Sequence, residues 1–307
     1  MLTNDDLAPI VLFTYNRLEL TKKTVNHLQN NILAKYSNLI IFSDASKADG
    51  DEQQIKDIRR YLRSVKGFKS CRIIERENNF GLARNIIEGV TEIIQEFGKI
   101  IVLEDDLITS KNFLCFMNES LEYYKERRDI FSISGYTANL PSLNKLQIDD
   151  YLSYRPSSWG WATWKHQWAD IDWDVSDFKK FIKSRSETRK FNRGGIDMVR
   201  MLKHYMEGKN NSWTIRWSYA MYKDSKYCIY PKISKVQNIG FGDDATHCTG
   251  ENIYLTSLDI SCNSKFNHTN DISVNPQIAK EFSYQYSYIN KGIKKVKHFI
   301  RRKLNET

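Results

Sequence analysis

An apolar run that ends in three consecutive acids constrains this chain more than any other feature. Segment 99–107 reads K-I-I-V-L-E-D-D-L, and its β-branched residues predict a buried strand with an acidic end. Glu104, Asp105 and Asp106 have no lysine or arginine between them, so they repel one another unless a cation lies nearby. Oxygen ligands of this kind suit Mn²⁺ or Mg²⁺. The alternative is an acidic turn before a helix that starts near Ser110.

Apolar runs and helical patterns alternate along the first half of the chain. Short apolar runs predict strands at residues 9–14, 38–43, 71–75 and 130–134. Apolar residues at three- and four-residue steps predict helices at residues 18–32, 55–62, 82–97 and 113–124, with Asn16 as the expected cap of the first. This alternation predicts an α/β fold with a mostly parallel sheet and helices on both faces.

The predicted sheet has polar residues at the carboxyl ends of three strands. Ligands of open α/β sheets bind outside these ends. We therefore expect three separated segments to meet at one edge, namely Thr14 to Arg17, Asp44, and Glu104 to Asp106.

Length and composition favour one large domain followed by a tail. The 307 residues are 41% hydrophobic, which is enough for a substantial core, and we divide the chain into a domain at 1–275 and a tail at 276–307. No apolar run approaches the roughly 20 residues needed to span a bilayer, and the acidic N-terminus lacks a signal-peptide core, so we expect a cytoplasmic protein. The five cysteines form no C-x-x-C pair, which argues against disulfides or a zinc site.

The net charge of +9 permits nucleic acid, anionic lipid or a phosphorylated substrate as partners. No nucleic-acid recognition motif is found, so we expect no nucleic-acid partner. In the tail, Ile289, Ile293, Val296, Ile300 and Leu304 form an apolar stripe among seven lysines and arginines. Such a helix either lies on anionic lipid as a peripheral contact or docks on the domain with its basic face in solvent.

Five tryptophans lie between residues 159 and 173, and they have two interpretations. The segment Trp159-Gly160-Trp161 predicts flat apolar rings of the kind that line sugar-binding sites, with Gly160 allowing a close approach. Trp164 and Trp168, four residues apart, fit a helix that packs inward.

Six motifs in order resemble those of GT-A type glycosyltransferases, and among these the N-acetylglucosaminyltransferase type I family and its bacterial polysaccharide relatives. The similarity covers about residues 8–250. The motifs are F-T-Y-N-R at 13–17, F-S-D-A-S at 42–46, E-N-N-F-G-L-A-R-N at 77–85, L-E-D-D-L at 103–107, W-G-W at 159–161 and Y-P-K-I-S at 230–234. The resemblance implies a GT-A, Rossmann-like sheet, a loop-rich acceptor half and a basic amphipathic C-terminal helix.

The resemblance also implies roles for individual residues. Thr14 and Arg17 would lie at the nucleotide, with Arg17 on its phosphate or ribose, and Asp44 would hydrogen-bond the uracil. The segment from Asn79 to Arg84 would line the base and diphosphate. Asp106 would be the direct metal ligand, with Asp105 near the ribose and Glu104 near the donor sugar.

One departure from the family leaves the catalytic base open. Where the animal enzymes have W-D-x-W, this chain reads Trp213-Thr214-Ile215-Arg216 and has no carboxylate. An inverting transferase needs a carboxylate to deprotonate the acceptor hydroxyl. The candidates are Asp243 and Asp244 in the loop N-I-G-F-G-D-D-A-T-H-C, and Asp197, each of which is otherwise a solvated loop acid. In the same loop His247 either contacts diphosphate or metal, or makes structural hydrogen bonds.

These observations predict a metal-dependent inverting glycosyltransferase that moves N-acetylglucosamine or another hexose from a UDP-sugar to a bacterial surface glycan. A lipid-linked acceptor at the inner face of the cell membrane would fit the basic tail. A non-catalytic sugar- or nucleotide-binding module is one alternative. A sugar-nucleotide pyrophosphorylase is another, although the glycine-rich phosphate loop that such enzymes need after the first strand is missing here.

Overall fold

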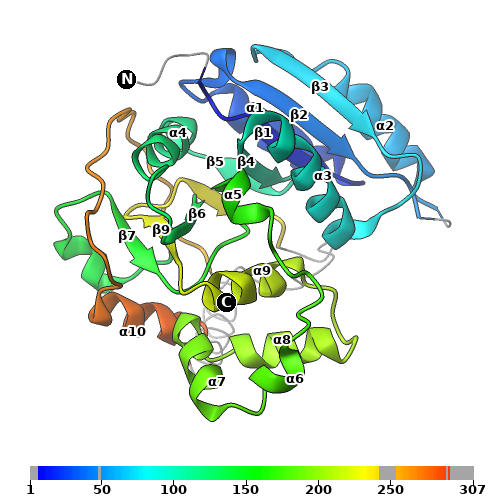
Figure 1. Cartoon of the computed structure of the whole chain (residues 1–307). Helices are drawn as coiled ribbons and strands as arrows, with labels where there is room; N and C mark the ends of the chain where they lie inside the picture. The colour runs from blue at the N-terminus through cyan, green and yellow to red at the C-terminus, as the bar shows by residue number, and fades with distance from the viewer. Residues whose placement is uncertain (1–5, 48–49, 242–253, 288–289, 291–307) are drawn as a thin grey trace, which may run out of the picture.

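An eight-stranded sheet forms the centre of the computed structural model, which describes residues 6–47, 50–241, 254–287 and 290 (Figure 1). The strand order is β3-β2-β1-β4-β8-β6-β9-β7. The strands span β1 Ile10–Thr14, β2 Asn38–Ser43, β3 Ser70–Glu75, β4 Lys99–Glu104, β6 Ile130–Ser134, β7 Asp150–Ser153, β8 Trp161–Trp164 and β9 Tyr227–Pro231. A separate two-stranded sheet pairs β5 Leu107–Thr109 with β10 Val236–Asn238.

Most strands of the large sheet run in one direction. β3, β2, β1 and β4 are parallel, whereas β8 is antiparallel to both β4 and β6. Two reversals restore the first direction, so β6 and the parallel β9 run as β4 does, and only β8 and β7 oppose them. The predicted α/β fold with a mostly parallel sheet is therefore confirmed.

Helices cover the sheet and form a separate group at one end of the molecule. They span α1 Leu18–Gln29, α2 Glu52–Leu62, α3 Gly81–Phe97, α4 Phe113–Tyr123, α5 Lys165–Trp168, α6 Phe178–Phe181, α7 Arg185–Phe191, α8 Met198–Met206, α9 Trp213–Lys223 and α10 Pro276–Gln285. Short 3₁₀ helices lie at Ala34–Tyr36, Pro141–Lys145 and Asn192–Gly194. Figure 1 shows α6, α7 and α8 grouped below the sheet, next to α9.

Three details of the predicted helices are wrong. Asn16 does not cap the first helix, because Arg17 is the N-cap residue and the Asn16 amide lies 3.5 Å from a carboxylate oxygen of Asp51. That helix ends at Gln29, and Ile32 beyond it is 39% exposed. The helix after the acidic triplet begins at Phe113, and β5 separates the two. The alternative of an acidic turn at the start of that helix is therefore wrong.

Two apolar clusters hold the fold together. The larger one fills the space between the sheet and its helices, and it includes a group of four buried tryptophans, namely Trp161, Trp168, Trp213 and Trp217. The smaller cluster joins the lower helices through Val175, Phe181, Phe191, Met198, Leu202, Ile215 and Tyr219. The lower helices are thus a unit with its own core.

The first part of the predicted tail packs on the domain. Ile278 and Phe282 of α10 are buried, and the Phe282 ring meets Tyr230 of β9 edge-on at 5.2 Å. The apolar stripe predicted beyond α10 lies outside the described residues. Within the described part of the chain, no helix is long and apolar enough to cross a membrane.

Candidate active site

The carboxyl ends of β1, β2 and β4 bring the predicted nucleotide residues to one edge of the sheet. In the register of these strands, Phe13 is paired with Glu104, and Thr14 with Ser43. The residues that follow each strand therefore leave the sheet at the same level. The predicted convergence of the three segments is confirmed.

A single arginine meets two of the three acids. An Nη atom of Arg17 lies 3.1 Å from Oδ2 of Asp106, and the other Nη contacts Asp105. The backbone amide of Tyr15 also donates to Asp105, at 3.4 Å. Burial raises the pKa of Asp105 to about 6, although the charge of Arg17 lowers it.

Glu104 completes a group of acids that the protein balances incompletely. Burial raises the pKa of Glu104 to about 8, and the charges of Asp106 and Asp105 act in the same direction. The raised pKa values mean that these acids resist ionising together beside one arginine, and an added cation would stabilise their ionised forms. Asp106 and Glu104 are both partly exposed, whereas Asp105 is buried; the Asp106 side chain is 14% exposed and that of Asp105 is 4% exposed.

The residues at this edge fit a divalent ion that is held by one protein carboxylate and takes its other ligands from a bound substrate. In the part of the chain described here, no three His, Cys, Asp or Glu side chains come together to hold a metal. Mg²⁺ is commonly held by one or two carboxylates together with substrate phosphates. Asp106 is placed to be such a ligand.

The small sheet supports Asp106 from behind. Asn238 of β10 donates to Oδ1 of Asp106 at 3.3 Å, and the amide of Ile239 donates to its backbone oxygen at 2.8 Å. A Cβ on Gly240 would lie 2.3 Å from Oδ2 of Asp106, so only glycine fits there. Gly240 therefore marks a close approach of the backbone to Asp106. Asn238 was not predicted, because its role depends on the pairing of β10 with β5.

Asp44 anchors the start of α3. Its Oδ1 accepts from the amides of Ala45 and Phe80, each at 2.9 Å, and its Oδ2 accepts from Gly81 at 3.0 Å. The Asn79 amide group is 3.4 Å from Oδ2 and donates to the backbone oxygen of Ala45 at 2.6 Å. Gly81 has a φ of 68°, in the left-handed region that favours glycine. Asp44 and Asn79 are thus brought together as predicted.

Tyr15 and Asp51 also lie at this edge; Tyr15 falls within the predicted segment Thr14 to Arg17, although it was given no role, and Asp51 was not predicted. The hydroxyl of Tyr15 contacts the carboxylate of Asp51, and this hydroxyl also accepts a hydrogen bond from the backbone amide of Lys47 at 3.3 Å. Burial, together with Asp51, raises the pKa of Tyr15 to about 12. Tyr15 belongs to the F-T-Y-N-R motif, which was the available signal. Arg84, which was predicted, is exposed, pairs with Glu88 at 2.6 Å and stacks on Phe80.

The W-G-W segment divides between packing and surface. Gly160 has a φ of 57°, and a Cβ there would meet Val236 at 2.7 Å. Trp161 is 1% exposed and lies within the tryptophan cluster, so its ring is a core side chain and is not available to a sugar. Trp159 is half-buried and meets Tyr136 edge-on at 4.8 Å. It alone of the two rings is partly accessible.

The candidate bases are placed unequally. Asp197 is buried and pairs with Arg155 at 2.7 Å. Asp243, Asp244 and His247 lie outside the described residues.

The profile of Glycosyl transferase family 2 matches residues 10–181, which is more than half of the chain. This chain belongs to that family. It is therefore a glycosyltransferase, and the predicted enzyme class is confirmed. The matched residues include the three strand ends and the acidic triplet. The finer resemblance to the N-acetylglucosaminyltransferase type I family stays a prediction.

Solved structures show weaker similarities. The mannosyltransferase PcManGT from Pyrobaculum calidifontis, in complex with GDP-Man and Mn²⁺, is 8% identical with a TM-score of 0.38, over 72% of each chain. GalNAc-T7 with UDP, GalNAc and Mn²⁺ is 11% identical with a TM-score of 0.48, over 83% of this chain and 47% of the other. TarS from S. aureus is 14% identical with a TM-score of 0.34, over 54% and 30%. No curated protein sequence matches the chain.

Proposed function

We propose that this glycosyltransferase moves N-acetylglucosamine or another hexose from a UDP-sugar to a bacterial surface glycan, with inversion and with a divalent metal. The observation that supports it most is the acidic group at the strand ends, where Glu104, Asp105 and Asp106 lie together and Arg17 pairs with Asp105 and Asp106. A nucleotide diphosphate brings further negative charge, so it would bind there only with added cations. When bound, a Mn²⁺ or Mg²⁺ ion would supply the positive charge that stabilises the departing diphosphate.

The chain's own residues would divide the work of holding the donor. Arg17 would bind the phosphate or ribose while it fixes the orientation of Asp105 and Asp106, with Thr14 beside it. Asp106 would hold the metal, Asp105 would face the ribose and Glu104 the donor sugar. These roles are the ones that the resemblance to GT-A glycosyltransferases implies.

Asp44 is proposed to recognise the uracil. An ionised carboxylate has about four acceptor positions. Three are taken by backbone amides at 2.9–3.0 Å, and the fourth by the longer 3.4 Å contact with Asn79. A uracil N–H would replace this last contact, and the released Asn79, together with the segment up to Arg84, would line the base and diphosphate.

The acceptor hydroxyl needs a base on the face opposite the leaving group. We assign this role to Asp243 or Asp244 ahead of Asp197, because the carboxylate of Asp197 is already paired with a buried arginine. His247 is proposed to contact the diphosphate or the metal. Trp159, next to the close approach at Gly160, is proposed to contact the sugars.

Calorimetric titration with UDP, GDP and dTDP, each with and without Mn²⁺, tests this proposal. We expect tight binding of UDP alone, and only with metal. Preference for another nucleotide would contradict the role of Asp44, and indifference to metal would contradict that of Asp106. Release of UDP from a UDP-sugar by the same preparation would separate the enzyme from a binding module without turnover.

A peripheral contact with the inner face of the membrane, and a lipid-linked acceptor, are proposed from the basic residues that follow α10. Segment 291–307 holds seven lysines and arginines and one acid. Each basic residue near an anionic bilayer adds about 1 kcal/mol of attraction. Truncation after Asn290 keeps α10 on the core, and we expect it to reduce sedimentation with phosphatidylglycerol vesicles. An unchanged bound fraction would favour a docked helix.

A further inference from the structure

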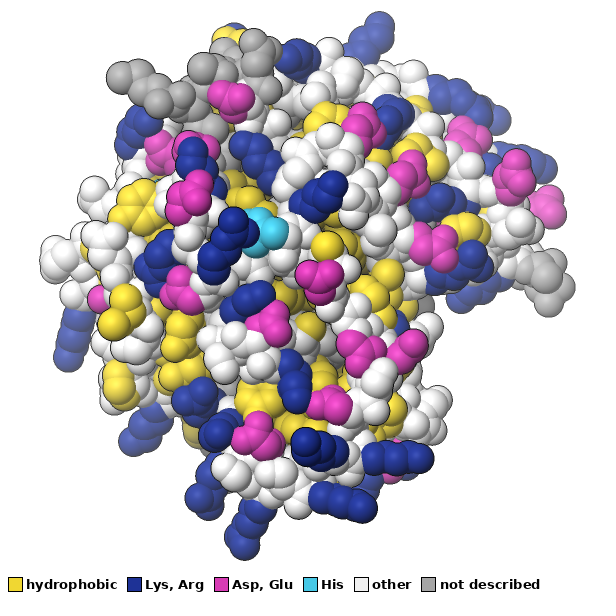
Figure 2. All heavy atoms as spheres, viewed as in Figure 1, with side chains coloured by type: hydrophobic (Ala, Val, Ile, Leu, Met, Phe, Trp, Pro, Cys, Tyr) yellow, Lys and Arg dark blue, Asp and Glu magenta, His cyan; other side chains and the backbone are white. Residues whose placement is uncertain are grey.

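The segment that contains the lower helices has a net positive charge almost as large as that of the whole protein. Segment 179–209 contains ten lysines and arginines and three acids, a net charge of +7, whereas the whole chain has +9. All ten basic residues are exposed, and one of the three acids, Asp197, is buried against Arg155. Figure 2 shows lysine and arginine side chains gathered at the lower end of the molecule, where Figure 1 places α6, α7 and α8. This surface attracts anions.

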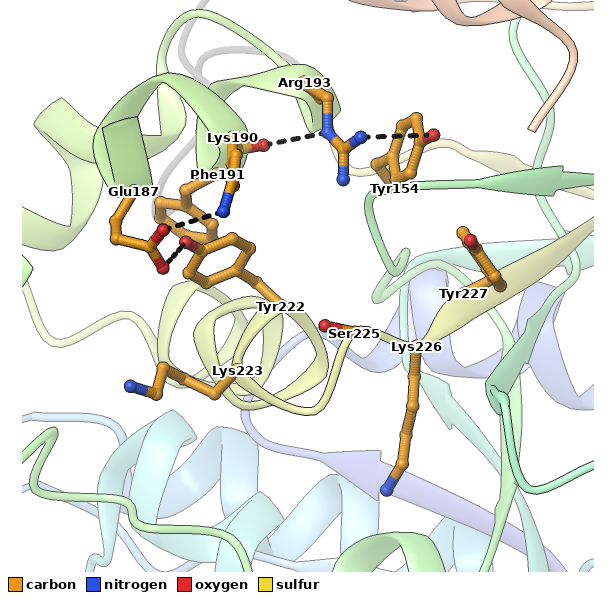
Figure 3. Close-up of a pocket in the computed structure, with 10 residues that line it drawn as sticks. All are labelled: Tyr154, Glu187, Lys190, Phe191, Arg193, Tyr222, Lys223, Ser225, Lys226 and Tyr227. Atoms are coloured by element: carbon orange, nitrogen blue, oxygen red, sulfur yellow. Dashed lines mark hydrogen bonds and ion pairs between the residues drawn. The ribbon is translucent and has the colours of Figure 1, made fainter. Parts of the chain in front are cut away.

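A pocket of about 160 Å³ opens between α7, the end of α9 and the start of β9 (Figure 3). Figure 3 shows Arg193 and Tyr154 at its top, Tyr222 and Tyr227 on its two sides and Ser225 below. A cavity of about 150 Å³ holds one benzene molecule. The pocket therefore has room for one six-membered ring.

The basic residues of the pocket differ in how their charges are balanced. Within the described residues, no carboxylate lies within ion-pair distance of Arg193. The three lysines that line the pocket each have an acidic partner: Lys190 with Glu187 at 3.0 Å, Lys223 with Asp177 at 2.6 Å and Lys226 with Asp224 at 2.7 Å. Arg193 thus leaves one positive charge for a ligand.

Contacts within the protein hold the guanidinium of Arg193 in place. It lies over the Tyr154 ring, 4.1 Å from the ring centre, and its Nε donates to the backbone oxygen of Lys190 at 3.3 Å. Nη1 is 3.5 Å from the Tyr154 hydroxyl. A guanidinium has five N–H donors. Three therefore remain for a carboxylate or phosphate, which arginine binds in a bidentate manner.

The rest of the lining suits a sugar ring. Tyrosine rings offer flat apolar faces, and hydroxyl groups can bond to sugar hydroxyls. The Tyr222 hydroxyl is already bound to Glu187 at 2.6 Å, and the Tyr154 ring lies against Arg193. The ring and hydroxyl of Tyr227 and the hydroxyl of Ser225 are therefore the groups that line the pocket for a sugar.

The pocket and the acidic triplet lie at opposite ends of the strands, the pocket at an amino end and the triplet at a carboxyl end. β9 runs in the same direction as β4, and the pocket residues Lys226 and Tyr227 stand at its amino end. The triplet begins at the carboxyl end of β4. A ligand in the pocket would not occupy the donor site.

We propose that this pocket binds a sugar residue that bears a carboxylate or phosphate, within an anionic glycan acceptor, at a distance from the transfer site. The choice of a glycan as the ligand rests on the proposed function, whereas the negative charge rests on Arg193 and its surroundings. The glycan would contact the enzyme at both ends of the strands of one sheet.

Ligand-observed NMR and calorimetry with three saccharides test the pocket in the absence of any nucleotide. The probes are trigalacturonate for the carboxylate, glucose 6-phosphate for the phosphate and maltotriose as the neutral match. We expect one or both anionic probes to bind, and Arg193→Ala to weaken that binding about tenfold or more. Arg193→Lys should give a smaller loss, because it keeps the charge without the planar fork.

Lys180→Ala is the matched control, since Lys180 is an exposed basic residue of the same segment outside the pocket. It should change affinity less than twofold. Equal losses in the Arg193 and Lys180 variants would mean diffuse attraction and would overturn the site, as would no binding of either anionic probe at 10 mM. Binding of phosphatidylglycerol vesicles that depends on Arg193, without saccharide binding, would make the pocket a lipid-headgroup site and also overturn the proposal.

Titration of Arg193→Ala with UDP and Mn²⁺ separates this proposal from the first. Unchanged UDP affinity is expected, because the two sites lie at opposite ends of the strands. If the unmodified protein binds an anionic saccharide but no UDP, the donor assignment fails and the pocket stands.

Discussion

Two arginine–aspartate pairs in this enzyme look alike locally and differ in charge balance. Arg17 lies 3.1 Å from Asp106, and Arg155 lies 2.7 Å from Asp197. Each aspartate also has a glycine packed against it, since a Cβ on Gly240 or on Gly195 would fall within 2.7 Å of its carboxylate. Close packing therefore does not distinguish the two pairs.

The groups around each pair do distinguish them. Arg17 serves Asp105 and Asp106 beside Glu104, whereas the Arg155 guanidinium has Asp197 on one side and lies 3.9 Å from the centre of the Tyr286 ring. The first arrangement has an excess of acid and suits a bound cation. The second is balanced, and we infer that it holds the structure together.

Asp106→Asn should give the largest effect on activity. The amide keeps the size of the side chain but removes a charge that a metal ion needs, so sugar transfer should fall about 10³-fold. The midpoint of thermal unfolding should stay the same or rise, because residue 106 would no longer carry a negative charge that Glu104 and Asp105 repel. Rates with a UDP-sugar, and UDP binding with and without Mn²⁺, provide the measurements. Unchanged Mn²⁺-dependent affinity would remove the metal role of Asp106.

Asp197→Asn should instead destabilise the protein. It leaves the buried charge of Arg155 without its carboxylate, which costs about 3 kcal/mol of unfolding free energy. Urea denaturation measures this, and Asp177→Asn, which affects a more exposed pair with Lys223, should cost less than about 1 kcal/mol. A large loss of transfer by Asp197→Asn at unchanged stability would restore Asp197 as the catalytic base.

The first half of the fold was predictable because its strands and helices are regular. The apolar runs at β1, β2, β3 and β4 separate clear helical patterns, and parallel strands must bring their polar ends together. The lower helices were not predicted, because α6, α7 and α8 are short and their cluster is completed by α9, far along the chain.

The site was predictable where residues act from a strand end and not where they act through a distant partner. Arg17, Asp44 and Asp106 each follow a strand. The contact between Asn238 and Asp106 depends on β10 pairing with β5 across more than a hundred residues, and the sequence carries no local sign of it. The burial of Trp161 likewise depends on Trp213 and Trp217 of α9.

Gly240→Ala tests whether the support behind Asp106 matters to the chemistry. The added methyl would lie 2.3 Å from Oδ2 of Asp106, so the carboxylate or the β10 loop must move. A displacement of about 1 Å at a reacting centre lowers rates about 10²-fold. Gly195→Ala is the control, since it crowds the Asp197 pair in the same way and should lower stability more than transfer. Equal effects of both variants on transfer would contradict the distinction between the two pairs.

Tyr15→Phe should give the smallest effect, because it removes one hydroxyl from the edge that holds Arg17. The phenol joins Asp51 to the start of α1 and accepts from the Lys47 amide, while the other oxygen of Asp51 is buried and has no hydrogen-bond partner among the described residues. Losing the hydroxyl should cost about 1 kcal/mol in stability and reduce UDP affinity about fivefold, since Lys47 is three residues after Asp44 in the sequence. Calorimetry with UDP and Mn²⁺ measures the affinity, and Tyr61→Phe, on α2, is the control. If Tyr15→Phe lowered stability but left UDP affinity unchanged, the role of Tyr15 would be structural, like that of the Arg155–Asp197 pair. Tyr15 would then not contribute to the donor site that contains Arg17.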